Sequence, residues 1–377
     1  MTTAINQNTI VEAKNPRLLS LDILRGITIA SMIIVNEPGI HDHAYAPLLH
    51  AAWNGITPTD FVFPFFVFMS GVSVSLSYSK QLEKGIPRNK MIGKIFKRTI
   101  ILFFLGMFLS ISPLFNIYNV RVPGVLQRIG IVYMCCSLLF LYISWKFQAR
   151  LGAAILILYC LAMTLIPVPG YGYAILEPGK NLAAWLDSLV IPGRLWQGTW
   201  DPEGILSTFP AIVTGITGML AGHLIISKQT AERKIIWLFV CGFISFAIAN
   251  AWHWFFPINK NLWTSPFVMY TSGLASMVLA TLYFVVDVLG YKKWATFPMI
   301  YGSNAIAAYV FAGIASDLLF LKWGGKTGVS ANNIIINAVT PSGIPLEIIS
   351  LAWAISFCLF CFTPIYILYK KKIFLRI

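Results

Sequence analysis

The chain has 377 residues, of which 57% are hydrophobic and 11% are charged, and its mean hydropathy is +0.73. Soluble domains carry about 25% charged residues, so this composition excludes a soluble globular protein. The net charge of +14 does not indicate nucleic acid, because the basic residues lie between apolar segments rather than along one soluble face. We expect an all-α polytopic membrane protein, surrounded by membrane lipid and without a nucleic-acid partner.

Ten apolar runs are long enough to cross a hydrocarbon core of about 30 Å. We therefore expect about ten transmembrane helices, and the absence of alternation with period two excludes a transmembrane barrel. The runs cover residues 19–38, 58–79, 95–112, 123–144, 149–167, 205–226, 235–255, 267–289, 297–320 and 346–369. The corresponding domains are an N-terminal tail (1–18), one membrane domain (19–369) and a basic C-terminal tail (370–377).

The distribution of Lys and Arg predicts the orientation of these helices. Of 28 basic residues, 20 lie in one set of connecting segments and six in the opposite set. This bias places both termini in the cytoplasm. The most basic segment, residues 80–98, holds seven cations and a single acid, Glu83.

Polar residues gather where the first two helices meet the outer side. The first helix ends in Asn36, the second begins near Asp60, and the loop between them contains His50 in the sequence HAAWNG. Ionisable groups at membrane depth are costly and mark functional sites. A neutral imidazole is suited to proton transfer at neutral pH, so His50 is a candidate catalytic residue, with a structural hydrogen bond as the alternative.

Other polar residues on the same side have structural explanations that compete with functional ones. The sequence DPEG begins with Asp201 and is typical of a helix N-cap. His41 and His43 favour plain solvation, because two ligands without a third are weak support for a metal site. The six cysteines fall within the apolar runs and indicate packing. We therefore predict no metal.

Six motifs occur in order between about residue 17 and residue 369. They are SLDILRGITIASMIIVN (20–36), HAAWNGITPTDFVFPFFVFMSGVS (50–73), VPGVLQRIGIVY (122–133), DPEGILSTFPAI (201–212), NKNLWTSPFVMYTSG (259–273) and GSNAIAAYV (302–310). Together they resemble the heparan-α-glucosaminide N-acetyltransferase family, which includes a lysosomal membrane enzyme and bacterial relatives. The resemblance implies acetyl transfer from cytoplasmic acetyl-coenzyme A to the amine of a terminal glucosamine, or a related glycan, on the opposite side.

The resemblance also implies residue roles. The family's active-site histidine corresponds to His50, the general base, and the asparagine beside it corresponds to Asn36, which orients the imidazole or donates to the oxyanion. We assign Asp60 to fixing the tautomer, with helix capping as the alternative. Direct transfer and an acetyl-histidine intermediate both remain open. The predicted acceptor-binding residues are Trp53, Asn54, Arg128, Asp201, Glu203, Lys260 and Trp263.

The coenzyme phosphates require cations. Much of the charge in residues 80–98 is also explained by topology, whereas Arg25 stands within a helix, where an unpaired arginine is expensive. Arg128 lies within the fourth helix toward the outer side, where Asp60 is its expected partner. Asn304 is assigned to the path of the pantetheine arm, with helix packing as the alternative. The predicted coenzyme-binding residues are Arg25, Lys94, Lys97, Arg98 and Asn304.

Two departures from the family affect localisation and substrate. The chain starts almost at the first motif, which suggests a multi-pass protein of the bacterial inner (cytoplasmic) membrane. The segment EPGIHDHAYAPLL before His50 also differs from the family. The acceptor therefore stays open: it is a small molecule or a glycan, and it is acetylated on nitrogen or on oxygen. A homodimer is a compatible assembly. The rival function is a transporter of an amino sugar or glycan fragment. The sequence shows no evident inverted repeat, which argues against a transporter. A purely structural scaffold would not explain the polar residues on the outer side.

Overall fold

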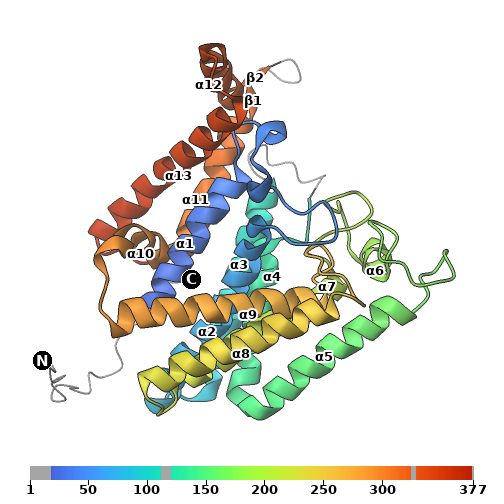
Figure 1. The fold of residues 1–377 in the computed structure, drawn as a ribbon, viewed down its shortest axis with the longest axis vertical. Helices are drawn as coiled ribbons and strands as arrows, with labels where there is room; N and C mark the ends of the chain where they lie inside the picture. The colour runs from blue at the N-terminus through green and yellow to red at the C-terminus, as the bar shows by residue number, and fades with distance from the viewer. Residues whose placement is uncertain (1–17, 112–119, 324–327, 376–377) are drawn as a thin grey trace, which may run out of the picture.

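A computed structural model describes residues 18–111, 120–323 and 328–375 of the chain. Most of the expected N-terminal tail and the last two residues of the expected C-terminal tail lie outside this part. Figure 1 shows long helices throughout, with α8 and α9 side by side in the lower half and α1, α11 and α13 in the upper half. The expectation of an all-α polytopic membrane protein is confirmed.

Thirteen α-helices occur in the described residues. Their bounds are α1 (Leu19–Asn36), α2 (Val62–Glu83), α3 (Arg88–Ile111), α4 (Val125–Tyr142), α5 (Trp145–Leu165), α6 (Leu182–Val190), α7 (Ile205–Ile226), α8 (Ala231–Trp252), α9 (Ser265–Leu282), α10 (Thr296–Ser303), α11 (Ala305–Phe320), α12 (Ala331–Val339) and α13 (Leu346–Lys370). A π-helical segment (Tyr283–Val288) extends α9, and the strands β1 (Lys322–Trp323) and β2 (Val329–Ser330) pair antiparallel. Short 3₁₀ turns interrupt the loop before α2.

Each of the ten apolar runs forms a helix or a broken helix. By length and composition, eight helices in the described residues suit a membrane span, and α10 with α11 gives a ninth across a bend of 73°. The remaining run, residues 95–112, corresponds to α3, which begins at Arg88 rather than at residue 95. Its last 18 residues still include Lys94, Lys97 and Arg98, so these cations lie on a helix and not in a loop.

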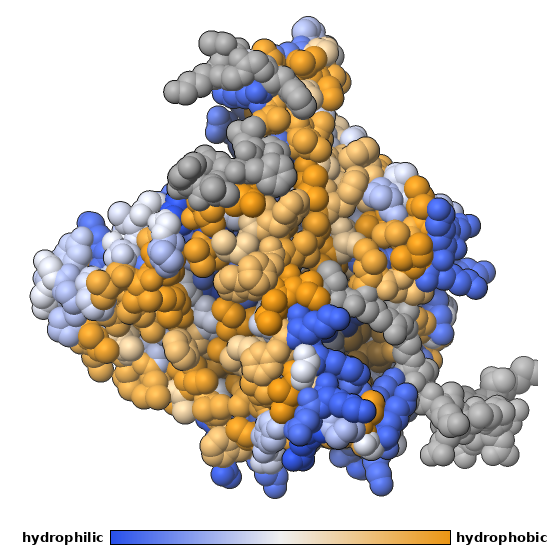
Figure 2. Space-filling model, turned by 180° about the vertical axis from the view of Figure 1, so that it is seen from behind, coloured by the Kyte–Doolittle hydropathy of each residue, from blue (hydrophilic) through white to orange (hydrophobic). Residues whose placement is uncertain are grey.

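Apolar side chains cover the outside of the helix bundle, as a lipid-facing protein requires. Figure 2 shows hydrophobic surface over most of one face, with hydrophilic residues gathered at its lower edge and its sides. The helix α8 illustrates the pattern, because most of its side chains are exposed although its sequence is apolar. Lipid satisfies such a surface, whereas water does not.

Two glycines bring α1 and α10 into backbone contact. A Cβ atom on Gly26 would lie 1.6 Å from the carbonyl oxygen of Pro298, and one on Gly302 would lie 1.8 Å from that of Asp22. Only glycine permits this approach. The contact places the break between α10 and α11, at Asn304, close to the first turns of α1.

Candidate active site

His50 faces a buried carboxylate and a lysine at one end of the helix bundle, which we call the loop end. Nδ1 of His50 lies 2.7 Å from Oδ1 of Asp60. Nζ of Lys260 lies 2.9 Å from Nδ1 and 3.2 Å from Nε2 of His50, and 3.5 Å from Oδ1 of Asp60. The His50 side chain is 49% exposed, whereas that of Asp60 is 1% exposed. A fixed carboxylate therefore holds an imidazole that solvent and ligands reach.

The position of Asp60 follows from the local fold. Asp60 lies in a 3₁₀ turn (Pro58–Phe61) that forms a capping box with Thr57. Its Oδ2 accepts hydrogen bonds from the backbone N–H groups of Ala51 (3.2 Å) and Thr57 (3.0 Å) and from the Thr57 hydroxyl (3.1 Å). One oxygen caps the turn while the other faces His50, so capping and orientation do not compete.

This arrangement selects one tautomer of the neutral imidazole. The Asp60 carboxylate receives several donors and acts as an acceptor. Nδ1 of His50 therefore carries the proton and donates to Oδ1, which makes Nε2 the basic site of the ring. In this structure the neighbour of Nε2 is Nζ of Lys260, 3.2 Å away. Burial lowers the pKa of Lys260, and the nearby Asp60 opposes this shift.

Two loops far apart in the sequence hold Lys260 over His50. The backbone N–H of Gly55 donates to the carbonyl of Ile258 (2.8 Å), and Nδ2 of Asn259 donates to Oδ1 of Asn54 (3.1 Å). Within the second loop, Oδ1 of Asn259 accepts from the N–H of Leu262 (2.9 Å). Asn54 thus positions the loop that carries Lys260.

Trp53 connects the His50 loop to the long connection between α5 and α7. Its Nε1 donates to the carbonyl of Leu176 (2.9 Å), and its ring meets Trp200 edge-on at 5.1 Å. The side chain is partly exposed. Trp53 therefore lies at the surface of the loop end, next to the candidate site.

Asp201 and Glu203 bind an arginine that the sequence analysis had not singled out. Asp201 accepts from Nε and Nη2 of Arg121 (2.7 Å each), and Glu203 also pairs with Arg121. The prediction that Asp201 is the helix N-cap is wrong. The N-cap of α7 is Gly204, and Oδ1 of Asp187 accepts from the first backbone N–H, that of Ile205 (2.8 Å).

Arg128 and Trp263 are core residues. Both are 1% exposed, and the Arg128 guanidinium lies 5.1 Å from the Trp263 ring. Nη2 of Arg128 donates to the carbonyl of Gly204 (3.1 Å) and to Ser207, so the expected pair with Asp60 is wrong. Asp201 is also buried, at 3%. Arg128 also lines a cavity of about 410 Å³, together with Glu203.

Asn36 lines a separate cavity of about 200 Å³, together with Glu37, Tyr309, Ser316 and Asp317 among others. The Ser316 hydroxyl donates to Oε2 of Glu37 (2.6 Å). In the described part of the chain Asn36 makes no hydrogen bond to His50, whose Nδ1 faces Asp60 instead. Asn36 therefore does not orient the His50 imidazole in this structure.

Burial raises the pKa of Glu37 to about 7 from its usual value of 4.5. The folded protein therefore keeps a proton that the unfolded chain loses above pH 4.5, so stability falls as the pH rises from about 4.5 to about 7. We expect Glu37→Gln to be more stable than the wild type at pH 8, by about 2 to 3 kcal/mol, and similar at pH 4.5. Thermal unfolding of both proteins across this range checks the sign; an equal difference at both pH values would contradict it.

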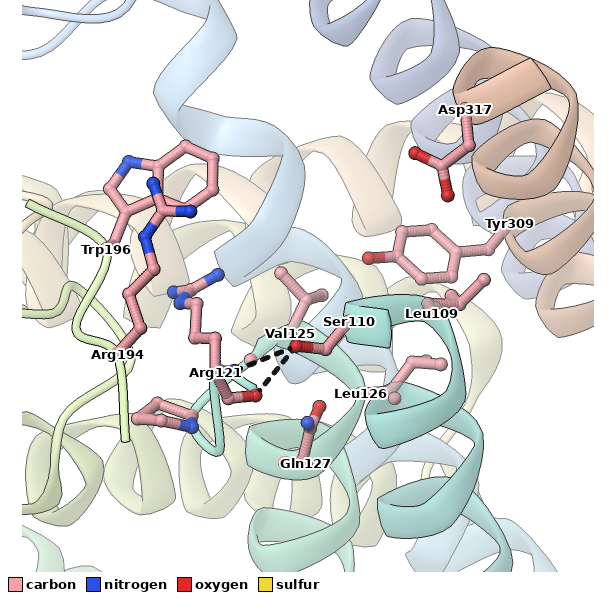
Figure 3. A pocket seen from close by; sticks show the side chains of 13 residues that line it. Leu109, Ser110, Arg121, Val125, Leu126, Gln127, Arg194, Trp196, Tyr309 and Asp317 are labelled. Atoms are coloured by element: carbon pink, nitrogen blue, oxygen red, sulfur yellow. Dashed lines mark hydrogen bonds between the residues drawn. The ribbon is translucent and has the colours of Figure 1, made fainter. Parts of the chain in front are cut away.

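A second cavity at the loop end has a volume of about 310 Å³ and shares Leu109, Tyr309 and Asp317 with the first. Figure 3 shows Arg121, Arg194 and Trp196 on one side and Tyr309 and Asp317 on the other. Ser110 fixes the backbone of Arg121 through two hydrogen bonds of 2.9 and 3.1 Å. None of these lining residues was assigned to a site from the sequence alone.

The opposite end of the bundle, which we call the basic end, contains the largest described cavity, of about 760 Å³. All five residues predicted to bind coenzyme line it: Arg25, Lys94, Lys97, Arg98 and Asn304. Arg25 is not unpaired, because it donates to Asp22 (3.0 Å) and to Ser73. The cations thus converge from α1 and α3 on one space.

A narrow apolar section lies between the two ends. Its volume is about 10 Å³, and its lining includes Ile29 and Phe63. It shares Phe66, Ile129 and Ile306 with the cavity at the basic end, and Leu126 and Tyr309 with the larger cavity at the loop end. The three spaces therefore follow one another along the bundle.

The fold and these sites define a polytopic helical membrane protein with a histidine–carboxylate pair at one end and a basic cavity at the other. A family model described as heparan-alpha-glucosaminide N-acetyltransferase, catalytic, matches residues 17–248. The chain belongs to this family of N-acetyltransferases. The heparan-alpha-glucosaminide N-acetyltransferase of Homo sapiens is 30% identical over 426 residues, which cover 97% of this chain and 61% of the relative. The heparan-alpha-glucosaminide N-acetyltransferase of Mus musculus is 30% identical over 420 residues, which cover 96% of this chain and 60% of the relative. The chain thus spans about three fifths of the length of these relatives.

Proposed function

We propose that this protein transfers the acetyl group of acetyl-coenzyme A, bound at the basic end, to an acceptor amine beside His50 at the loop end. The acceptor is a glucosamine-type amino sugar or a related glycan, and a hydroxyl acceptor would use the same base. The observation that carries this proposal is the row of cavities that share lining residues between the basic end and the loop end, the end at which the histidine–carboxylate pair also lies.

The basic cavity suits the donor. Coenzyme A carries several phosphate charges, which Lys94, Lys97, Arg98 and Arg25 would neutralise. The same cations sit in the segment whose charge bias favours the cytoplasm, where acetyl-coenzyme A is present. The protein would then lie in the bacterial inner membrane with the loop end facing the periplasm. The pantetheine arm would extend along the narrow section, which must widen by side-chain rotation.

Catalysis at the loop end would begin at His50. Nε2 accepts the proton of the acceptor nitrogen as that nitrogen attacks the thioester carbon. The C–S bond then breaks and the coenzyme leaves as a thiolate. The imidazolium of His50 passes its proton to this thiolate or to water. Asp60 stabilises the imidazolium, while Lys260, beside His50, or Asn36, which lines a loop-end cavity, would donate to the oxyanion. Trp53, Asn54 and Glu203 would border the acceptor.

A transporter is the second candidate, because a broken helix such as α10–α11 is a feature of transporters. Purified protein distinguishes the two functions. We expect acetyl-coenzyme A to raise the thermal unfolding temperature in the absence of sugar, because ligand binding to the folded state stabilises it. Stabilisation by glucosamine alone, with none by acetyl-coenzyme A, would favour the transporter.

A single larger side chain should prevent the narrow section from widening. Ile29 lines this section but neither end cavity. We expect Ile29→Phe to lower acetyl transfer by about tenfold or more, because it blocks the approach of the thioester to the acceptor. Coenzyme A binding should stay within about twofold of the wild type.

The matched control is Ile29→Val, which removes one methylene and adds no bulk to the section. Steady-state rates and calorimetric coenzyme A binding on both folded variants provide the readout. Wild-type turnover in Ile29→Phe would show that the acetyl group does not pass this section.

A further inference from the structure

The C-terminal segment Ile373–Leu375 returns to the break between α10 and α11. Asn304, which occupies the break and is 2% exposed, binds this segment with both atoms of its amide. Nδ2 donates to the carbonyl of Ile373 (3.1 Å), and Oδ1 accepts from the N–H of Leu375 (2.8 Å). Leu375 lines the cavity at the basic end.

A strained turn sends the chain back to this position. The helix α13 ends at Lys370, and Lys372 has a φ of +55°, a conformation that side chains other than glycine rarely adopt. The N–H of Ile373 donates to the carbonyl of Leu368 (2.9 Å), which closes the turn. The contacts with Asn304 therefore hold the end of the chain in an arrangement that the turn alone does not favour.

The docked segment also determines what Asn304 does for α11. An asparagine at the N-cap position usually accepts a hydrogen bond from the first turn of its own helix. Asn304 is the N-cap residue of α11 but makes no such bond, because Oδ1 is engaged by Leu375. If the segment left, the amide would be free to rotate onto α11 and change the wall of the cavity at Gly302–Ile306.

We propose that residues 373–375 form a strap that belongs to the coenzyme site: held by Asn304, the strap completes one wall of the basic cavity and keeps the start of α11 in its binding-competent shape. This inference rests on the proposed function, because it takes acetyl-coenzyme A as the ligand of that cavity. Asn304 is then a positioning residue rather than a direct ligand of the coenzyme.

The strap is held through its backbone, and this permits a sharp test. Leu375→Pro removes the N–H that Asn304 accepts from, whereas Leu375→Ala removes the side chain and keeps the N–H. Affinity for acetyl-coenzyme A is measured by calorimetry on the full chain in nanodiscs, together with kcat and KM for both substrates. We expect the dissociation constant and KM for acetyl-coenzyme A to be about tenfold higher in Leu375→Pro than in Leu375→Ala, the size expected for one buried hydrogen bond.

The KM for the acceptor should not change between the two variants, since the strap and His50 lie at opposite ends of the bundle. Deletion of residues 373–377 should reproduce the effect of Leu375→Pro. Equal coenzyme affinity in the proline and alanine variants overturns the strap but leaves the proposed function standing. A wild-type protein that binds no acetyl-coenzyme A overturns both, and a loss of kcat with unchanged affinity shows a merely structural role.

Discussion

Replacement of His50 by alanine is expected to lower acetyl transfer by about 10² to 10⁴-fold, the range typical for loss of a general base. The side chain is half exposed and its known partners are Asp60 and Lys260, so its removal leaves no cavity in the core. The fold and coenzyme affinity should therefore persist. Rates in proteoliposomes and calorimetric binding of coenzyme A measure the two quantities separately.

His43→Ala is the matched control for that experiment. His43 lies in the same loop, but its Nδ1 faces Glu347 at 3.3 Å rather than the Asp60 carboxylate. We expect this variant to retain acetyl transfer within a few-fold of the wild type, as usual for substitutions away from the chemistry. Near-normal turnover in His50→Ala would refute the assignment of the base.

Asp60→Asn is expected to reduce turnover by about 10² to 10³-fold while the protein still folds. The asparagine carbonyl can keep the hydrogen bonds that Oδ2 accepts from Ala51 and Thr57. The amide nitrogen then faces Nδ1 of His50 as a donor, so Nδ1 becomes the acceptor and the proton moves to Nε2. Nε2 can no longer act as the base.

The comparison variant is Thr57→Val, which removes the hydroxyl that donates to Oδ2 of Asp60 and leaves Oδ1 free to face His50. This variant should lose stability but keep most of its turnover per folded molecule. The ¹⁵N chemical shifts of the His50 ring report the tautomer directly. An unchanged Nδ1–H tautomer in Asp60→Asn would contradict the explanation, whatever the rate.

The helices could be predicted because their apolar runs match the thickness of a membrane. The start of α3 could not be predicted, because charged residues such as Arg88 and Lys90 are typical of a loop, whereas here they form the first turn of the helix. Hydropathy also does not determine how a helix is rotated about its axis. Arg128 was therefore paired with Asp60, whereas it points to Gly204 and Ser207.

Some contacts of the candidate site could likewise be predicted from the sequence, and others could not. His50 and Asp60 are ten residues apart and share one loop and turn, so local sequence was sufficient to bring them together. Lys260 was assigned to the acceptor side, but its contact with His50 spans 210 residues and depends on the Asn54–Asn259 bond. The return of the chain end to Asn304 had no signal in the sequence, because backbone atoms make the contact.

The most direct test of the account is a sided assay in vesicles of known orientation. Acetyl-coenzyme A is supplied only at the face that carries the basic end, and glucosamine only at the face that carries His50. We expect N-acetylglucosamine to form on the His50 side and free coenzyme A to appear on the other, with no product from His50→Ala vesicles. Product that forms only when both substrates share one compartment would contradict transfer along the bundle.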